Sequence, residues 1–279
     1  MRWQGRRESS NIEDRRGRGM GRSAGVGGIG MIIVLLVGIF FGVDLSPLLG
    51  PGGVVTTDSA PSGPNAIDDE QERFVAVVLA QTEDVWTPLF SQAGLQYTQP
   101  KLVLFTGQTG SACGFAQSAM GPFYCPNDQT VYLDMDFFRV MESQLGSRGD
   151  FAKAYVIAHE VGHHVQDEQG ILQQVNAARS RASERDSNAL SVRVELQADC
   201  YAGVWARSVT GTLELTDADI RSALDTAARI GDDALQRASQ GRVVPDSFTH
   251  GTSQQRQEWF YRGFRTGDDE QCDTFSGRI

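Results

Sequence analysis

The sequence lacks the excess of basic residues that binding to nucleic acid requires. It has 25 Lys and Arg against 35 Asp and Glu, a formal net charge of −10. The imbalance is uneven, because residues 1–43 hold seven arginines against three acidic residues and the remainder is strongly acidic. A nucleic-acid-binding domain presents a basic face, so the large acidic segment is not expected to bind nucleic acid.

Cysteine is scarce, and the four present show none of the short Cys-x-x-Cys spacings typical of structural zinc sites. A zinc held by all four thiolates is therefore the weaker interpretation. Four cysteines allow three disulfide pairings, among which sequence alone does not choose. We favour a local staple from Cys113 to Cys125 and a clamp from Cys200 to Cys272 on the C-terminal tail. Such pairings predict an exported domain.

Charge is absent from residues 23–43, where apolar residues and glycine dominate. About 20 apolar residues cover the hydrocarbon core of a bilayer, so we predict a transmembrane helix over 23–43. The arginine-rich residues 1–22 predict a disordered basic tail in the cytoplasm, because positive charge is retained on that side. Residues 44–67 contain four prolines among Gly, Ser and Thr and predict a flexible linker.

These features predict a single-pass cell membrane protein with a cytoplasmic N-terminus and an extracytoplasmic catalytic domain. A cleaved signal peptide is the alternative. Its apolar core is normally shorter, and no Ala-x-Ala site follows Val43.

No internal repeat divides the rest of the chain, and one domain over residues 68–279 is predicted. Short strands over 101–105 and 130–133 precede helices near 149–169, 187–209, 216–236 and 253–265. Strands followed by helices, without βαβ alternation, favour an α+β fold with a small sheet.

Histidine is also rare, yet two of the four histidines stand four residues apart in His159-Glu160-Val161-Gly162-His163. On an α-helix this spacing places both imidazoles on one face, one turn apart, where they can bind the same Zn²⁺. Glu160 can then take a proton from a metal-activated water. The apolar neighbours of the motif predict a buried helix, in which such polar side chains without a metal would be poorly solvated.

A catalytic zinc takes three protein ligands and keeps one position open. A metzincin would have its third histidine where this chain has Gln169, so that class is excluded. His164 points about 100° away around the helix and is predicted to pack or to support the site. Glu195 and Asp199 stand four apart around the small Ala198, which lets their helix approach another closely. We predict Glu195 as the third ligand and Asp199 as the partner that orients a ligating histidine; an exposed acidic helix face is the alternative.

Four blocks of the sequence resemble the neutral zinc metallopeptidase family of bacterial membrane proteins. They read AHEVGHHVQ, ELQADCYAGVW, SACGFAQSAMGPFYCPNDQTVYLD and DSFTHGTSQQRQEWFYRGF. HExxH followed by ExxxD is similar to the gluzincins, and the resemblance implies a zincin-like fold. It implies the ligands His159, His163 and Glu195, the base Glu160 and the orienting carboxylate Asp199. It also implies a substrate beside an edge strand, for which our candidate is 130–134.

No sequence motif identifies the residue that stabilises the oxyanion, the negatively charged oxygen formed when water attacks the scissile carbonyl. His250 is our candidate, provided that the tail folds back and the second disulfide holds it there. Tyr201 is a weaker candidate. Alternatively, Thr252 or Ser253 caps the helix that follows, and His250 is merely nearby.

Together these features predict a zinc-dependent endopeptidase that hydrolyses peptide bonds with a metal-activated water and Glu160 as general base. Its predicted partners are a peptide or protein substrate and, through residues 23–43, the membrane; the oligomeric state is not specified. The alternative is a non-catalytic zinc-binding module that recruits envelope partners, which would not need a base beside the ligand. A zinc hydrolase of cell-wall amides is disfavoured, because the acidic sequence shows no obvious polysaccharide groove.

Overall fold

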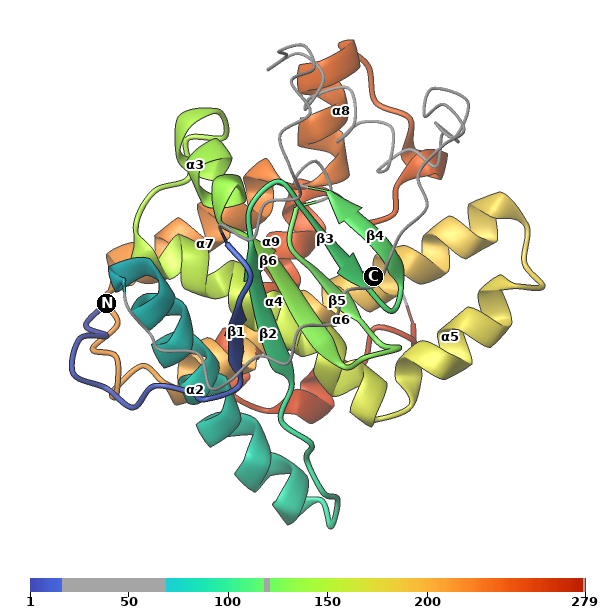
Figure 1. The fold of residues 1–279 in the computed structure, drawn as a ribbon. Coiled ribbons are helices and arrows are strands. Elements are labelled where there is room, and N and C mark those ends of the chain that lie inside the picture. Colours follow the sequence, from blue (N-terminus) through green and yellow to red (C-terminus); the bar gives the residue numbers. More distant parts are fainter. Residues whose placement is uncertain (17–68, 118–120, 278) are drawn as a thin grey trace.

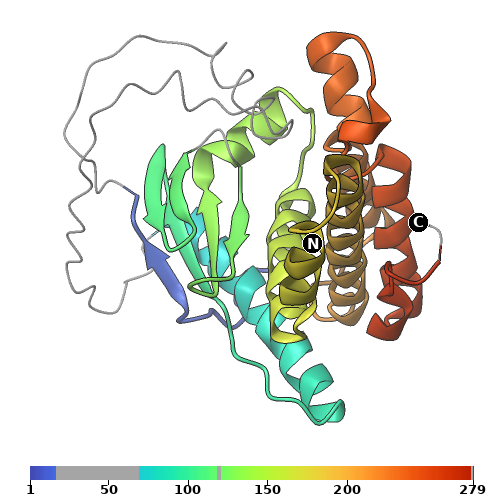
Figure 2. The same ribbon diagram turned by 90° about the vertical axis from the view of Figure 1, so that its right-hand side faces the viewer.

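The computed structural model describes residues 1–16, 69–117, 121–277 and 279. In them a small sheet packs beside a layer of helices (Figures 1 and 2), which confirms the predicted α+β class. The predicted transmembrane helix over 23–43 and linker over 44–67 lie outside the described residues. Among the helices that the structure describes, none is both long and apolar enough to cross a bilayer.

The main sheet has the strand order β1-β2-β6-β5. Its strands are β1 (Ile12–Asp14), β2 (Lys101–Phe105), β5 (Phe123–Cys125) and β6 (Thr130–Asp134). β2 pairs in parallel with β1 and β6, and β5 pairs antiparallel with β6. A separate antiparallel hairpin is formed by β3 (Gln108–Ser111) and β4 (Gly114–Gln117).

The helices follow the sheet in the chain, except for the first. They are α2 (Glu70–Gln92), α3 (Met135–Ser143), α4 (Asp150–Glu168), α5 (Ile171–Arg179), α6 (Glu184–Ser208), α7 (Asp217–Arg229), α8 (Asp232–Gln240) and α9 (Ser253–Thr266). Three predicted helices correspond to α4, α6 and α9. The single helix predicted over 216–236 is wrong, because the chain breaks it into α7 and α8. Gly231 at the break packs against α9, where a Cβ would lie 2.4 Å from the backbone nitrogen of Ser253.

Alternation along the strands sorts their side chains onto two faces of the sheet. Leu102 and Leu104 of β2, with Val131 and Leu133 of β6, are fully buried in the main core shared with the helices. A smaller cluster gathers the intervening side chains, namely Val103, Phe105, Tyr132 and Cys125. The main core therefore supports α4, the helix that carries the histidine motif.

The predicted edge strand is in the wrong place. β6 lies in the interior of the sheet between β2 and β5, and the two edge strands are β1 and β5. The reason is the turn over 126–129, which folds β5 back alongside β6; Gln129 in this turn has a φ of 52°. On this side of the sheet, the backbone groups at the edge are therefore those of Phe123–Cys125.

The predicted disordered tail is also wrong for residues 1–16, which fold onto the domain. β1 extends the sheet beside β2, and Trp3 is only 4% exposed. Arg7 pairs with Glu83 at 2.9 Å, and Arg16 lies 3.6 Å from a carboxylate oxygen of Glu72. Both glutamates belong to α2 and are buried, so part of the positive charge that indicated a solvated tail neutralises buried carboxylates instead.

Both favoured disulfides, Cys113–Cys125 and Cys200–Cys272, are present in the structure. The first joins the β3–β4 hairpin region to the edge strand. The second ties the C-terminal tail to α6.

Candidate metal centre and active site

Helices α4 and α6 carry the site and lie in close contact. A Cβ built on Gly162 of α4 would lie 3.0 Å from the carbonyl oxygen of Ala198 on α6. Small residues on both helices thus let the backbones approach, as predicted for Ala198. The approach brings His159 and His163 opposite Glu195.

The three predicted ligands converge on one point. His159 Nε2 lies 3.1 Å from one carboxylate oxygen of Glu195, and His163 Nε2 lies 3.5 Å from the other. All three candidate ligand atoms lie within 4.8 Å of one another. Ligands at about 2.0–2.2 Å from a tetrahedral zinc stand about 3.4 Å apart. Two histidines and one carboxylate at these separations fit a zinc ion.

Asp199 orients the first of these ligands. Its Oδ1 accepts hydrogen bonds from His159 Nδ1 at 2.8 Å and from the hydroxyl of Tyr155 at 2.5 Å. A proton on Nδ1 leaves the lone pair of His159 on Nε2, which faces Glu195. The structure therefore places Asp199 where its predicted role requires.

Arg256 of α9 completes this network, and sequence reasoning missed it. Its Nε and Nη2 donate to the two carboxylate oxygens of Asp199 at 2.8 and 3.0 Å, and both side chains are buried. Burial alone would raise the pKa of Asp199, but the cations Arg256 and His159 lower it to about 2. The available signal was an arginine on the same helical face as the buried residues Phe260 and Gly263.

Both ligand imidazoles have raised pKa values in the metal-free protein. Burial opposes a charged imidazole, but Asp199 and Glu195 outweigh it and raise the pKa of His159 to about 10. The pKa of His163 is also raised, because Glu195 outweighs burial. Zinc requires the unprotonated nitrogen, so metal binding releases protons and weakens in acid.

Glu160 lies beside the ligand cluster and is only 8% exposed. Burial raises the pKa of its carboxyl, although the nearby His159 and His163 favour the anion. A carboxyl with a raised pKa can accept and return a proton closer to neutral pH.

His250 lies close enough to Glu195 for their charges to interact. Its loop is held by Asp232, whose Oδ2 accepts three successive backbone N–H groups ending at Gly251. Gly251 also packs against side chains of α6. The tail thus folds back as the His250 prediction requires, and Thr252 caps α9 as the alternative proposed. A catalytic role for His250 stays a prediction.

His164 and Tyr201, two further candidates from the sequence, form hydrogen bonds away from the ligand cluster. His164 contacts the carbonyl of Thr98 through Nε2 at 2.6 Å and the hydroxyl of Tyr124 through Nδ1 at 3.0 Å. Tyr201 donates its hydroxyl proton to Gln169 at 2.7 Å. Neither belongs to the ligand cluster, which agrees with the supporting role predicted for His164.

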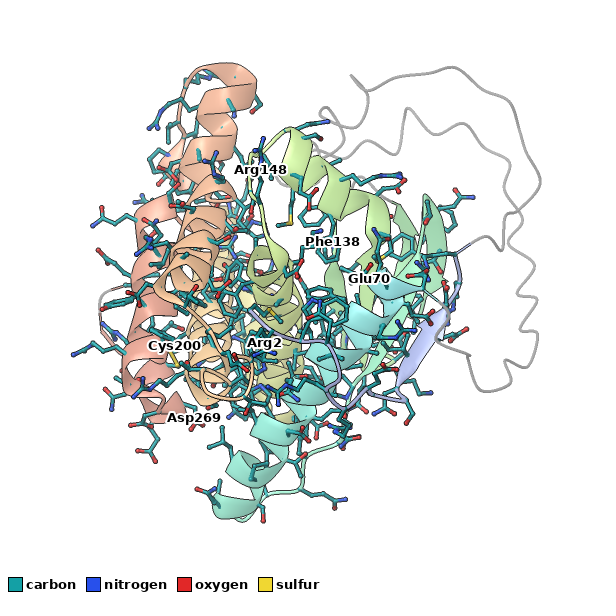
Figure 3. All side chains as sticks on the ribbon, turned by 90° about the vertical axis from the view of Figure 1, so that its left-hand side faces the viewer. Arg2, Glu70, Phe138, Arg148, Cys200 and Asp269 are labelled. Carbon is teal, nitrogen blue, oxygen red and sulfur yellow. A yellow bond between two sulfur atoms is a disulfide. The ribbon has the colours of Figure 1, made fainter. Side chains whose placement is uncertain are left out.

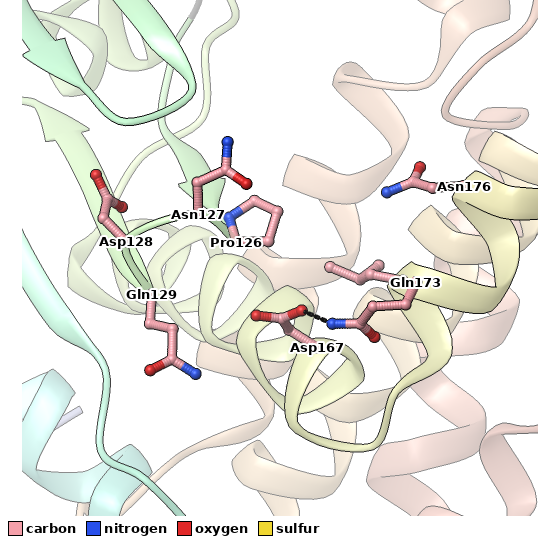
Figure 4. Close-up of a pocket in the computed structure, with 8 residues that line it drawn as sticks. Pro126, Asn127, Asp128, Gln129, Asp167, Gln173 and Asn176 are labelled. Atoms are coloured by element: carbon pink, nitrogen blue, oxygen red, sulfur yellow. Dashed lines mark hydrogen bonds between the residues drawn. The ribbon is translucent and has the colours of Figure 1, made fainter. Parts of the chain in front are cut away.

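A polar cavity of about 610 Å³ lies between the turn over 126–129 and α5 (Figure 4). Asp167 of α4 lines it and accepts a hydrogen bond from Gln173 of α5. Asp167 follows His163 by four residues, which is about 6 Å along a helix axis. The cavity thus lies one turn beyond the ligands, at the end of edge strand β5.

A two-histidine, one-carboxylate cluster with a buried glutamate beside it is an arrangement that zinc-dependent hydrolases use. The chain belongs to the family described as "Putative neutral zinc metallopeptidase", whose profile matches residues 1–275.

The curated relatives are themselves named as uncharacterized. The chain is 52% identical over 289 residues to the uncharacterized protein YpfJ of Escherichia coli (strain K12), with 100% of both chains covered. It is 46% identical over 222 residues to the uncharacterized protein Rv2575 of Mycobacterium tuberculosis (strain ATCC 25618 / H37Rv), covering 74% of this chain and 73% of that one. No solved structure gives a significant match.

Proposed function

We propose that this protein is a zinc-dependent endopeptidase in which Glu160 is the general base. The observation that carries the proposal is the convergence of His159, His163 and Glu195 within 4.8 Å, with buried Glu160 next to them. Membership of a zinc metallopeptidase family supports a peptidase role at a coarser level.

A zinc ion held by the three ligands would supply acidification of a water molecule and polarisation of the scissile carbonyl. Glu160 takes the proton of the attacking water and delivers it to the leaving amide nitrogen. Its raised pKa suits both transfers. His250, held beside Glu195 by the Asp232 loop, is the proposed donor to the oxyanion.

We propose that the substrate chain adds to edge strand β5 in an extended conformation. The edge of Phe123–Cys125 provides backbone N–H and C=O groups for pairing, a recognition mode that suits peptides of varied sequence. The turn that follows β5 lines the polar cavity, so a substrate side chain beyond the scissile bond can enter it. The lining includes Asp128 and Asp167, which favours a polar or basic side chain.

The test of the proposal is Glu160→Gln. This variant should bind zinc as wild type does and should cleave peptides a hundredfold to ten-thousandfold more slowly, the usual contribution of a general base. Zinc content and cleavage of a diverse peptide library are measured on the same preparations. Glu168→Gln, which removes a carboxylate from the end of the same helix, should retain activity.

Two outcomes would count against the proposal. Wild-type cleavage rates in Glu160→Gln would contradict the mechanism. Stoichiometric zinc in wild type without cleavage of any peptide would favour the non-catalytic binding module instead.

We also propose that the domain works outside the cytoplasm. Two disulfides support this location, because such bonds persist in oxidising compartments and are rare in the cytosol. Membrane attachment through residues 23–43 remains part of the proposal.

A further inference from the structure

A continuous row of buried polar groups leads from His163 to the C-terminal disulfide. His163 Nδ1 lies 2.9 Å from Gln166 Oε1, Gln166 Nε2 donates to Gln197 Oε1 at 2.9 Å, and Gln197 Nε2 donates to the carbonyl of Cys272 at 3.1 Å. Both glutamines are buried. Cys272 ends the short helix η4 (Asp269–Cys272) and is bonded to Cys200 of α6. Figure 3 shows Cys200 and Asp269 at the same end of the helical layer.

The carbonyls in this row fix the direction of every hydrogen bond. A backbone carbonyl only accepts, so Cys272 requires the amide nitrogen of Gln197 and turns the Gln197 oxygen toward Gln166. Gln166 then uses both amide hydrogens, one for Gln197 and one for the carbonyl of Val194 at 2.8 Å. Its own oxygen therefore faces His163. Because that oxygen only accepts, His163 carries a proton on Nδ1, and in the neutral ring Nε2 keeps its lone pair.

We propose that Gln166 and Gln197 are positioning residues that couple the Cys200–Cys272 disulfide to the zinc affinity of His163. The cross-link holds the Cys272 carbonyl beside α6, within reach of Gln197. Without it the carbonyl can move away and the Gln197 amide can turn its N–H groups toward those of Gln166. The Val194 carbonyl alone then holds the Gln166 amide, and the orientation of His163 is weakened.

The two histidine ligands differ in this respect. His159 is oriented by the carboxylate of Asp199, which a buried arginine holds in place. Both carboxylate oxygens accept hydrogen bonds, so turning this group over would not change which nitrogen of His159 donates. His163 is oriented by neutral amides, whose direction is set by the carbonyl of Val194 on α6 and by that of Cys272 on the disulfide-bonded tail. Zinc retention is therefore predicted to depend on the oxidation state of Cys200–Cys272. This inference rests on the proposed function only in taking Nε2 of His163 as a zinc ligand.

The first test is a double-mutant cycle on the glutamines, with zinc affinity measured by competition against a chelator of known strength. Gln166→Met should bind zinc tenfold to a hundredfold more weakly, the usual effect of removing a ligand's hydrogen-bond partner. Gln197→Met should also weaken binding. The double variant should be no weaker than Gln166→Met alone, because both changes break the same row. Losses that multiply, or unchanged affinity in either single variant, would overturn the proposal.

Gln169→Met is the matched control. Gln169 caps the C-terminus of α4 and accepts a hydrogen bond from Tyr201 of α6, but it lies outside the ligand cluster. Its zinc affinity should stay within about twofold of wild type, since no ligand loses a hydrogen-bond partner.

The second test removes the disulfide with Cys200→Ser and Cys272→Ser, in the wild-type and Gln197→Met backgrounds. Zinc affinity should fall in the first background and stay unchanged in the second, where the row is already broken. An equal fall in both would mean that the cross-link acts through general stability, and the coupling would be wrong. Circular dichroism checks folding; if the serine pair does not fold, the glutamine cycle decides alone.

These measurements need no substrate, so their outcome is separable from that of the proposed peptidase activity. A wild-type protein that binds no zinc would contradict the proposed function. Normal zinc binding with independent losses at the two glutamines would overturn the coupling alone.

Discussion

The carboxylate of Asp199 lies between an arginine, a tyrosine and a ligating histidine, and its charge should make folding depend on pH. Its pKa of about 2 is below the ordinary 3.8, so its contribution to stability is complete above about pH 4. That contribution is lost as pH falls from about 4 toward 2 and amounts to about 2 kcal/mol. Urea unfolding of the metal-free protein at pH 5 and pH 2.5 should show this extra loss relative to Asp199→Asn. Equal losses in both proteins would contradict the assignment.

Arg256 should matter for stability as well as for the site. Arg256→Leu leaves the carboxylate of Asp199 buried without its arginine partner, which costs about 3–5 kcal/mol when a buried pair is broken. Arg262→Leu on the same helix is the control, because that side chain is exposed and only stacks on Trp259; it should cost about 1 kcal/mol or less. Denaturant unfolding of both variants measures the difference. Similar costs for the two would show that burial of the pair is unimportant.

The ligand residues could be predicted because the information lies within single helices. His159 with His163, and Glu195 with Asp199, each repeat at four residues, and that spacing alone puts them on one face. Arg256 could not be found in this way. It reaches Asp199 across 57 residues of chain, through a contact that exists only because α9 packs on α6.

That packing depends on two glycines that face each other across α6 and α9. A Cβ on Gly263 would lie 1.9 Å from the carbonyl oxygen of Cys200, and one on Gly203 would lie 2.1 Å from that of Phe260. Both approaches are far inside van der Waals contact, so these helices can lie this close only without side chains at the crossing.

Gly263→Ala should therefore force the helices apart and cost about 3 kcal/mol, at the upper end of overpacking penalties. Zinc affinity should fall too, because α9 carries Arg256 and α6 carries Glu195. Gly211→Ala is the control, since a Cβ there meets nothing within 4 Å. Thermal unfolding and chelator competition measure the two effects. An unchanged unfolding midpoint in Gly263→Ala would contradict the close crossing.

At the level of elements, the helices could be predicted from the periodic spacing of apolar residues. Strand β1 and the order of strands in the sheet depend on contacts between distant segments and could not. α4, α6 and α9 were found from their apolar spacing. β1 was missed because its three residues lie among arginines, which indicate a solvated segment until the buried carboxylates of α2 are known. The edge position of β5 was missed because a turn, not composition, sets the order of strands.

On the scale of the whole molecule, the first residues are part of the fold. Trp3 packs edge-on against Phe74 and donates its indole N–H to Asp150 at 2.9 Å. Trp3→Ala should cost about 3–5 kcal/mol, as for other large buried side chains, measured by denaturant unfolding. Arg2→Ala, whose side chain is 75% exposed, should cost about 1 kcal/mol or less. Wild-type stability in Trp3→Ala would mean that this segment is not docked in solution.

Arg16 and Asp69 form an ion pair at 2.6 Å. Asp69 also caps the N-terminus of α2, so the pair joins the end of the N-terminal segment to the start of that helix.

The ion pair also closes the described part of the fold into a single unit. The chain leaves the described domain at Arg16 and rejoins it at Asp69, its immediate neighbour in space. Residues 1–16 and the metal centre therefore belong to one folded body, so a fragment that begins at Asp69 would lack strand β1 of its own sheet.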